Sequence, residues 1–153
     1  MKNLSRKLAQ FNALPWPDKR IFLAALLQLP LFWMGLRVLG LKRYQAWLHR
    51  KPHHDSGMLT QEEVMRMGAL VNLAARHAPV PATCLTRSLL LCRLLQRKGT
   101  DAQLHIGVRL TQAELEAHAW VEVAGTPVND RLDISEQFAA FNGILPLAAF
   151  QSP

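Results

Sequence analysis

The strongest constraint on the fold is one leucine-rich segment, CLTRSLLLCRLLQR, which runs from Cys84 to Arg97. It consists of good helix formers and is apolar around much of its circumference, which is typical of a helix buried on several sides. Pro79 and Pro81 hold the approach to it extended, and Gly99 follows its last turn as a helix stop. The sequence therefore predicts a buried central helix that begins near Cys84.

Three short segments with strand character follow this helix, at residues 102–110 (AQLHIGVRL), 117–123 (AHAWVEV) and 126–130 (TPVND). Only Ala124 and Gly125 separate the last two segments, and such a two-residue connection is typical of an antiparallel hairpin. A central helix that packs on a small antiparallel sheet predicts an α+β fold.

Helical patterns also precede the central helix. From Asp18 to about Leu48 the pattern is helical, and Pro30 predicts a break into two helices because an internal proline removes a backbone hydrogen bond. Residues 51–59 have the composition of a linker. We therefore expect a basic helical N-terminal region over residues 1–55 and a separate domain over residues 60–153.

A capping box opens the next predicted helix, with Thr60 as the cap and Glu63 three residues later. This helix must end before Pro79. Its expected buried face carries four apolar residues at helical spacing: Val64, Met67, Val71 and Ala74.

Positive charge is concentrated in the N-terminal third. Residues 1–51 hold ten Lys or Arg against one acid, and the rest of the chain holds eight against ten, so a net charge of +9 lies beside one of −2. A basic surface of this kind attracts an anionic membrane, partner protein or nucleic acid, although it can also be a solvated face. The apolar stretch 21–41 is long enough to span a bilayer, but three of its residues argue against a span: Gln28, Pro30 and Arg37.

Cysteine usage and the N-terminus indicate the cellular compartment. The two cysteines are spaced C-x7-C, which is neither a disulfide framework nor a common zinc pattern. No small-residue cleavage site follows the basic start and its apolar run. We expect a cytoplasmic protein, with membrane association through the N-terminal helices left open.

Cys84 has the sequence context of a nucleophile. A thiolate reacts where a thiol does not, so a catalytic cysteine needs surroundings that favour the thiolate. Thr83 can cap the helix, which places Cys84 in its first turn, beside free backbone N–H groups and the positive end of the helix dipole. Those N–H groups could also stabilise an oxyanion. An isolated cysteine at a helix start is more often structural, so Cys84 needs partners.

The predicted partners are His118 as the base and Asp130 as the residue that orients it. Strand alternation puts His118, Trp120 and Glu122 on one face, and Cys84 can meet His118 if the central helix packs on that face. Asp130 returns across the predicted hairpin, where it could fix the histidine tautomer and favour the imidazolium. Papain-like chemistry requires this order along the chain: a cysteine at a helix start, then a histidine on a strand, then an acid on the next strand.

Other residues offer alternatives. His105 and His77 are rival bases, and Asp133 is a rival orienting acid. Arg87 and Trp120 are candidates for substrate contact, although Trp120 could equally fill the core and Ser88 suits a structural role. Cys92, in mid-helix, predicts an inert buried thiol. We expect no metal site, since only a lone histidine pair in the linker is available: His53 and His54.

The runs PATCLTRSLLLCRLLQRKGTDAQLHIGV and AHAWVEVAGTPVND resemble the leader-peptidase half of split lasso-peptide maturation enzymes, in the transglutaminase-like superfamily. The resemblance covers roughly residues 60–153, and the basic helical N-terminus is similar too. It implies a papain/transglutaminase-like cysteine peptidase fold. Position by position, the family's catalytic residues fall on Cys84, His118 and Asp130.

The resemblance also implies a pathway. The reaction would be removal of the leader from a ribosomally made precursor, which a separate small recognition protein presents, before a macrolactam synthetase closes the ring. We expect the basic N-terminal helices to dock the recognition protein or its bound leader, and we expect no cofactor and no nucleic-acid partner. Two rival functions remain. One is a transglutaminase-like acyl transfer to an amine, and the other is a non-enzymatic protein that binds membrane or nucleic acid through its basic third.

Overall fold

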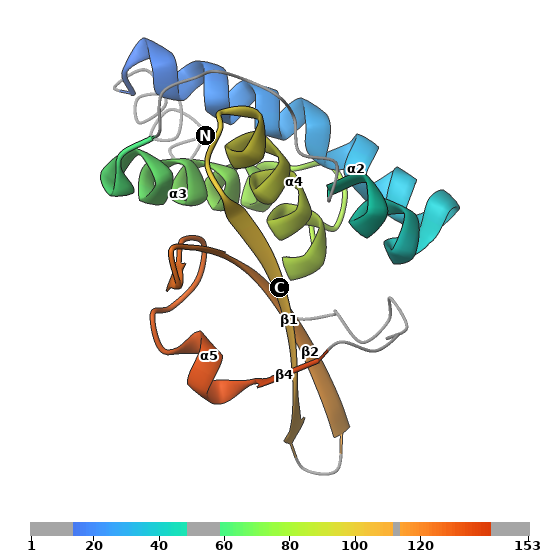
Figure 1. The fold of residues 1–153 in the computed structure, drawn as a ribbon. Helices are drawn as coiled ribbons and strands as arrows, with labels where there is room; N and C mark the ends of the chain where they lie inside the picture. Colours follow the sequence, from blue (N-terminus) through green and yellow to red (C-terminus); the bar gives the residue numbers. More distant parts are fainter. Residues whose placement is uncertain (1–13, 49–58, 112–113, 142–153) are drawn as a thin grey trace, which may run out of the picture.

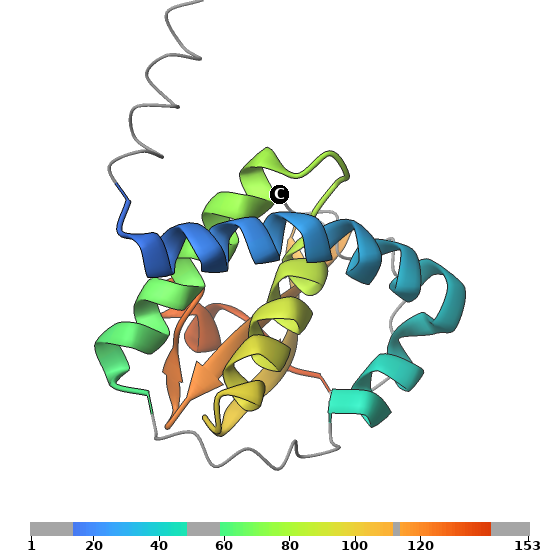
Figure 2. The same cartoon turned by 90° about the horizontal axis from the view of Figure 1, so that it is seen from above.

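Three helices lie over a small sheet in the computed structural model, which describes residues 14–48, 59–111 and 114–141 (Figure 1). The helices are α2 (Trp16–Leu48), α3 (Gln61–His77) and α4 (Cys84–Arg97). From above (Figure 2), α2 crosses over both α3 and α4 as the outermost layer, and the sheet lies on the other side of α4. The predicted α+β fold, with a central helix on a small antiparallel sheet, is confirmed.

Helix α2 breaks at Gly40 and not at Pro30, so the predicted position of the break was wrong. The helix runs through Pro30, whereas Gly40 leaves the helical region with φ +74° and ψ 164°. The fixed φ of proline is itself compatible with a helix, and proline costs the helix only one backbone bond and a kink. A positive φ is not helical at all and strongly favours glycine.

The inner face of α2 belongs to the main core. Arg66 of α3 donates from Nε to Asp18 Oδ2 at 2.8 Å, which ties the start of α2 to α3. Four further residues of α2 are buried in the same cluster as those of α3 and α4: Ala25, Leu29, Phe32 and Leu36. The predicted boundary between residues 1–55 and 60–153 thus separates segments that pack together. The predicted linker lies largely outside the described residues.

Helices α3 and α4 begin and end as predicted. Thr60 and Glu63 form the capping box, and α3 ends at His77, before Pro79. The predicted apolar face of α3 is buried. Thr83 caps α4 by accepting a hydrogen bond from the Thr86 amide, so Cys84 is the first residue of this helix.

The sheet has the order β3-β2-β1-β4. Strands β1 (Ala102–Thr111) and β2 (Glu114–Val123) pair antiparallel along their whole length, from Ala102 opposite Val123 to Thr111 opposite Glu114. The predicted two-residue turn is present, with φ 49° at Ala124 and 75° at Gly125. Strand β3 (Thr126–Pro127) is shorter than predicted, so Asp130 lies in the loop after it. The sequence did not predict α5 (Ile134–Gln137) or β4 (Ala139–Ala140).

Helix α4 packs on the face of β2 opposite to the one we expected. The leucines of α4 share a cluster with Ala117, Ala119 and Val121. Trp120 instead packs with Ile134 and Phe138. Small aliphatic side chains allow a leucine-rich helix to approach closely, whereas a histidine and a glutamate beneath it would be buried without hydrogen-bond partners.

Candidate active site

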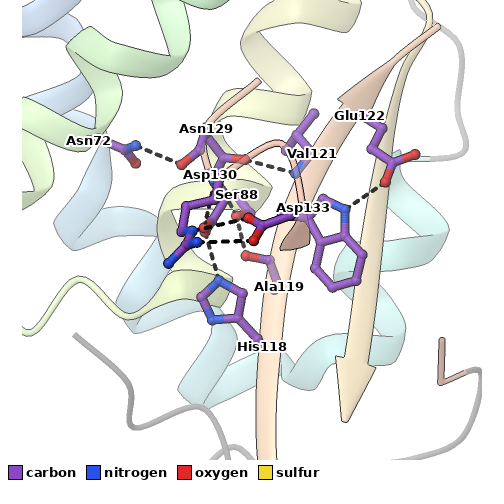
Figure 3. Close-up of polar contacts among 11 residues, drawn as sticks. Asn72, Ser88, His118, Ala119, Val121, Glu122, Asn129, Asp130 and Asp133 are labelled. Atoms are coloured by element: carbon purple, nitrogen blue, oxygen red, sulfur yellow. Dashed lines mark hydrogen bonds and ion pairs between the residues drawn. The ribbon is translucent and has the colours of Figure 1, made fainter. Parts of the chain in front are cut away.

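His118 and Asp130 form the centre of the site. The His118 Nε2 atom lies 2.7 Å from Asp130 Oδ2, and both side chains are largely buried (Figure 3). The Arg131 amide donates to the other carboxylate oxygen of Asp130 at 2.9 Å. The predicted meeting of an imidazole on β2 with an acid beyond the hairpin is therefore present, although the acid comes from a loop and not from a strand.

Cys84, the first residue of α4, is one of the groups that raise the pKa of His118. Ser88, one turn after Cys84, donates from Oγ to the Ala119 carbonyl at 2.9 Å, so the first turns of α4 lie beside the edge of β2. This contact brings the start of α4 close to β2, the strand that carries His118. The Cys84 side chain has no solvent exposure.

The His118 imidazole is held in its charged form. Burial opposes the charge, but the hydrogen bond to Asp130 and the interaction with the Cys84 thiol outweigh it and raise the pKa of His118 to about 9. Burial likewise opposes the Asp130 carboxylate, yet the hydrogen bond from His118 leads the effects that hold its pKa below the usual value. Arg87, on α4, adds to this through its charge.

Asn129 fixes the loop that carries Asp130. Its Oδ1 accepts from the Val121 amide at 2.8 Å and its Nδ2 donates to Ser88 Oγ at 2.8 Å. Its carbonyl accepts from Asn72 Nδ2 of α3 at 2.7 Å. Figure 3 shows this buried asparagine linking β2, α3 and α4 beside the His118–Asp130 pair.

Gly68 allows α3 to approach the same loop. A Cβ atom at this position would lie 1.9 Å from the Val128 carbonyl oxygen. Sequence reasoning missed both Gly68 and Asn129. The available signal for Asn129 was a polar residue next to the candidate acid, but its three partners lie far apart in the sequence.

Aromatic rings cover the imidazole on the α5 side. The Phe138 ring stacks on His118 with centroids 5.2 Å apart, and Trp120 stacks at 6.4 Å. Trp120 is 2% exposed and donates from Nε1 to Glu122 Oε1 at 2.7 Å. The predicted shared face of His118, Trp120 and Glu122 is thus present, and Trp120 contacts the imidazole as part of a small apolar cluster.

The rival residues have other partners. His105 stacks on Trp120 and lies 3.4 Å from Glu122, and the His77 ring contacts the Leu73 carbonyl. Asp133 pairs with Arg131 and Gln137. Within the described ranges no group of three metal-binding side chains converges. His53 and His54 lie outside the described residues.

Cys92 has a different environment from Cys84. Its sulfur donates to the Ala102 carbonyl at 3.3 Å. Burial is the largest effect that raises the pKa of this thiol to about 12, followed by the charge of Asp101. Its protonated thiol is unreactive at neutral pH, in agreement with the expected inert role.

Arg87 lies one turn after Cys84, half-buried. Its Nε atom is buried and has no hydrogen-bond partner among the described residues. This unpaired N–H group, close to Asp130, can donate a hydrogen bond to an acceptor on a bound ligand.

Comparison with known proteins identifies the family. The family model described as the transglutaminase-like superfamily matches residues 25–144. The chain belongs to this superfamily. The transglutaminase-like match begins inside α2 and extends past β4, so it includes every element of the site.

A relative is also known by sequence. The chain is 32% identical over 135 residues to the microcin J25-processing protein McjB of Escherichia coli, a match that covers 82% of this chain and 62% of that protein. The two matches confirm the predicted resemblance to lasso-peptide maturation proteins of the transglutaminase-like superfamily. No solved structure matches the chain.

Proposed function

We propose that this chain is a cysteine peptidase with Cys84 as nucleophile, His118 as base and Asp130 as orienting acid. The observation that carries the proposal is the 2.7 Å contact between His118 Nε2 and Asp130 Oδ2. The contribution of Cys84 to the raised pKa of this imidazole supports the choice of nucleophile. A histidine beside a cysteine can activate it as a nucleophile. Membership of the transglutaminase-like superfamily adds support to this assignment.

The proposed reaction has two covalent steps. In the reactive state the proton of Cys84 resides on His118, and the Cys84 thiolate attacks the scissile carbonyl carbon. Backbone N–H groups in the first turn of α4 stabilise the oxyanion, and the His118 imidazolium gives its proton to the leaving amine. A water molecule, deprotonated by His118, then attacks the thioester and releases the new carboxylate.

Two further features of the site, the burial of Cys84 and the position of Arg87, affect how a substrate binds. Because the Cys84 sulfur is buried, side chains around the first turn of α4 must move before a substrate carbonyl reaches it. We propose that substrate binding causes this movement. Arg87 would then contact the substrate through its buried guanidinium, whereas Trp120 would act on the substrate only through the imidazole on which it stacks.

We propose a lasso-peptide precursor as the substrate and removal of its leader as the reaction. The similarity to a microcin-processing protein supports this substrate class. A small recognition protein would deliver the leader, and a macrolactam synthetase would use the freed amine in the cytoplasm. The chain spans less than two thirds of that relative's length.

The test is mass spectrometry of a lasso precursor incubated with the chain and the recognition protein. Hydrolysis yields two fragments that together equal the precursor plus one water, and the Cys84→Ala chain yields neither. A product in which the leader is joined to an amine would instead indicate acyl transfer. Cleavage by the Cys84→Ala chain would contradict the proposal.

A further inference from the structure

Helix α2 carries an exposed and mainly apolar face. It is formed by residues spaced three, four or seven apart, so they share one side of the helix. We call this set the apolar stripe: Trp16, Leu23, Leu27, Leu31, Met34 and Val38. Trp16, Leu27 and Val38 are each more than 70% exposed. At a rise of 1.5 Å per residue the stripe is about 33 Å long, and α2 is the outermost layer of the molecule (Figure 2).

The opposite face of the helix rules out a transmembrane span in this fold. Trp16–Arg43 is long and apolar enough to cross a bilayer, and it is the one such helix among the described residues. However, Ala25, Leu29 and Leu36 lie in the core against α3 and α4. A helix held in this way can contact lipid along one side only and would lie parallel to the membrane.

The charges around the stripe identify its partner. Arg20, Arg37, Lys42 and Arg43 are exposed on α2. The single acid of the helix, Asp18, is buried and paired with Arg66. Arg20 lies within the stripe, Arg37 lies one residue before its end, and Lys42 and Arg43 follow the break at Gly40. An apolar stripe that begins at an exposed tryptophan and is accompanied by cations along the same helix has the composition of an interfacial helix on anionic lipid.

A protein partner fits the same face less well. Specific protein interfaces carry about one hydrogen bond per 100–200 Å². The stripe offers only Arg20 as a polar side chain within its width, so it holds little that could orient a folded partner. Binding to an anionic lipid surface requires apolar side chains that enter the acyl region and cations that contact the headgroups, and α2 supplies both.

We propose that the apolar stripe of α2 seats the protein on an anionic lipid bilayer, with the helix parallel to the membrane plane. The basic side chains within and near the stripe contact the lipid headgroups, and the apolar side chains enter the acyl boundary. This goes beyond the proposed peptidase activity, because it concerns where the enzyme acts and involves no residue of the site.

Co-sedimentation of the full chain with vesicles tests the proposal. Vesicles of phosphatidylglycerol and phosphatidylethanolamine should bind the protein, and vesicles of phosphatidylcholine alone should bind it weakly. The Leu27→Gln/Leu31→Gln double variant should lose about tenfold or more of the binding, and Arg20→Gln about fivefold. The matched control is Leu110→Gln/Leu115→Gln, which alters two exposed leucines of the β1–β2 hairpin and should bind as the wild type does.

Three outcomes would overturn the proposal. The first is equal vesicle binding by the wild type and the Leu27→Gln/Leu31→Gln variant. The second is no vesicle binding together with a dimer on size exclusion that this variant abolishes, which would assign the stripe to a second copy. The third is no vesicle binding together with loss of recognition-protein-dependent cleavage in the variant, which would assign it to a protein partner. Failure of the peptidase proposal is separate, since the Cys84→Ala chain should still bind vesicles.

Discussion

The first turn and the middle of helix α4 each carry a buried cysteine, but in opposite chemical surroundings. At the first turn, the Cys84 thiol interacts with an imidazole whose pKa is raised to about 9. Two turns later, the Cys92 thiol donates to a carbonyl, and burial leads the effects that raise its own pKa to about 12. Both cysteines are buried, so under the proposed function it is the presence of a group that can take the thiol proton that distinguishes Cys84 from Cys92.

The helix itself contributes to this difference. In the first turn of α4 backbone N–H groups have no intrahelical partner, and Thr83 caps one of them. These groups can support negative charge on sulfur or on an oxyanion. At Cys92 the helix N–H groups are already bonded within the helix, and the nearby charge of Asp101 opposes a thiolate.

The largest expected effect comes from removing the Cys84 sulfur. Cys84→Ala should lower kcat/KM for precursor cleavage by at least about 10⁴-fold, because the nucleophile is lost. Circular dichroism and thermal unfolding should show a folded chain, since only one buried atom is removed. Retained cleavage by a folded Cys84→Ala chain would show that Cys84 is no more reactive than Cys92 and would contradict its role as nucleophile.

Replacement of Asp130 should have the next largest effect. In the wild type the imidazolium persists through neutral pH, and activity should fall as pH rises through about 9. Asp130→Asn removes the carboxylate that favours this charge, so kcat should fall about 100-fold. The fall of activity at high pH, which we call the alkaline limb of the pH profile, should move to lower pH. The control is Asp133→Asn, which pairs with Arg131 and not with His118 and should leave the limb in place. A limb unmoved in Asp130→Asn would contradict the assigned role.

A smaller effect is expected at Asn129, which positions Asp130 and touches no substrate. Asn129→Ala leaves the Val121 amide without its acceptor, which costs about 1–3 kcal/mol in the free energy of unfolding. It should lower kcat about tenfold and shift the alkaline limb in the same direction as Asp130→Asn. Gln103→Ala, at an exposed position on β1, is the control. A loss of stability with an unchanged pH profile would limit Asn129 to a structural role.

The smallest effect is expected at Cys92, in the middle of α4. Cys92→Ala should leave kcat/KM within about a factor of two of the wild type, because a buried structural thiol takes no part in the chemistry. Loss of its packing and its contact with Ala102 should cost about 1–2 kcal/mol in the free energy of unfolding. If a folded Cys92→Ala chain lost as much activity as Cys84→Ala, Cys92 would not be a purely structural residue.

Local chemistry made much of the fold predictable. The Thr60 and Thr83 caps, the end of α3 before Pro79 and the Ala124–Gly125 turn all depend on residues next to one another in the chain. The break in α2 was misplaced because proline can be accommodated within a helix, whereas the backbone of Gly40 leaves it. Strand β4 and helix α5 were missed because each is too short to give a periodic pattern.

The contact between His118 and Asp130 was predictable from the sequence, but the packing around the pair was not. Strand alternation gave the shared face of His118 and Trp120, but it could not say which face α4 covers. Small side chains at Ala117, Ala119 and Val121 decide that packing. The anchoring of the Asp130 loop through Asn129 depends on partners 8, 41 and 57 residues away in the sequence, which no local pattern reveals.

The most direct test of the central claim is to trap the covalent intermediate. A lasso precursor presented by its recognition protein should be mixed with the chain, quenched in acid within one turnover and analysed by mass spectrometry. The account predicts a thioester between the leader's new C-terminus and the peptide that contains Cys84, absent in the Cys84→Ala chain and never found on Cys92. An acyl group on Cys92, or single-turnover cleavage in a Cys84→Ala chain, would contradict it.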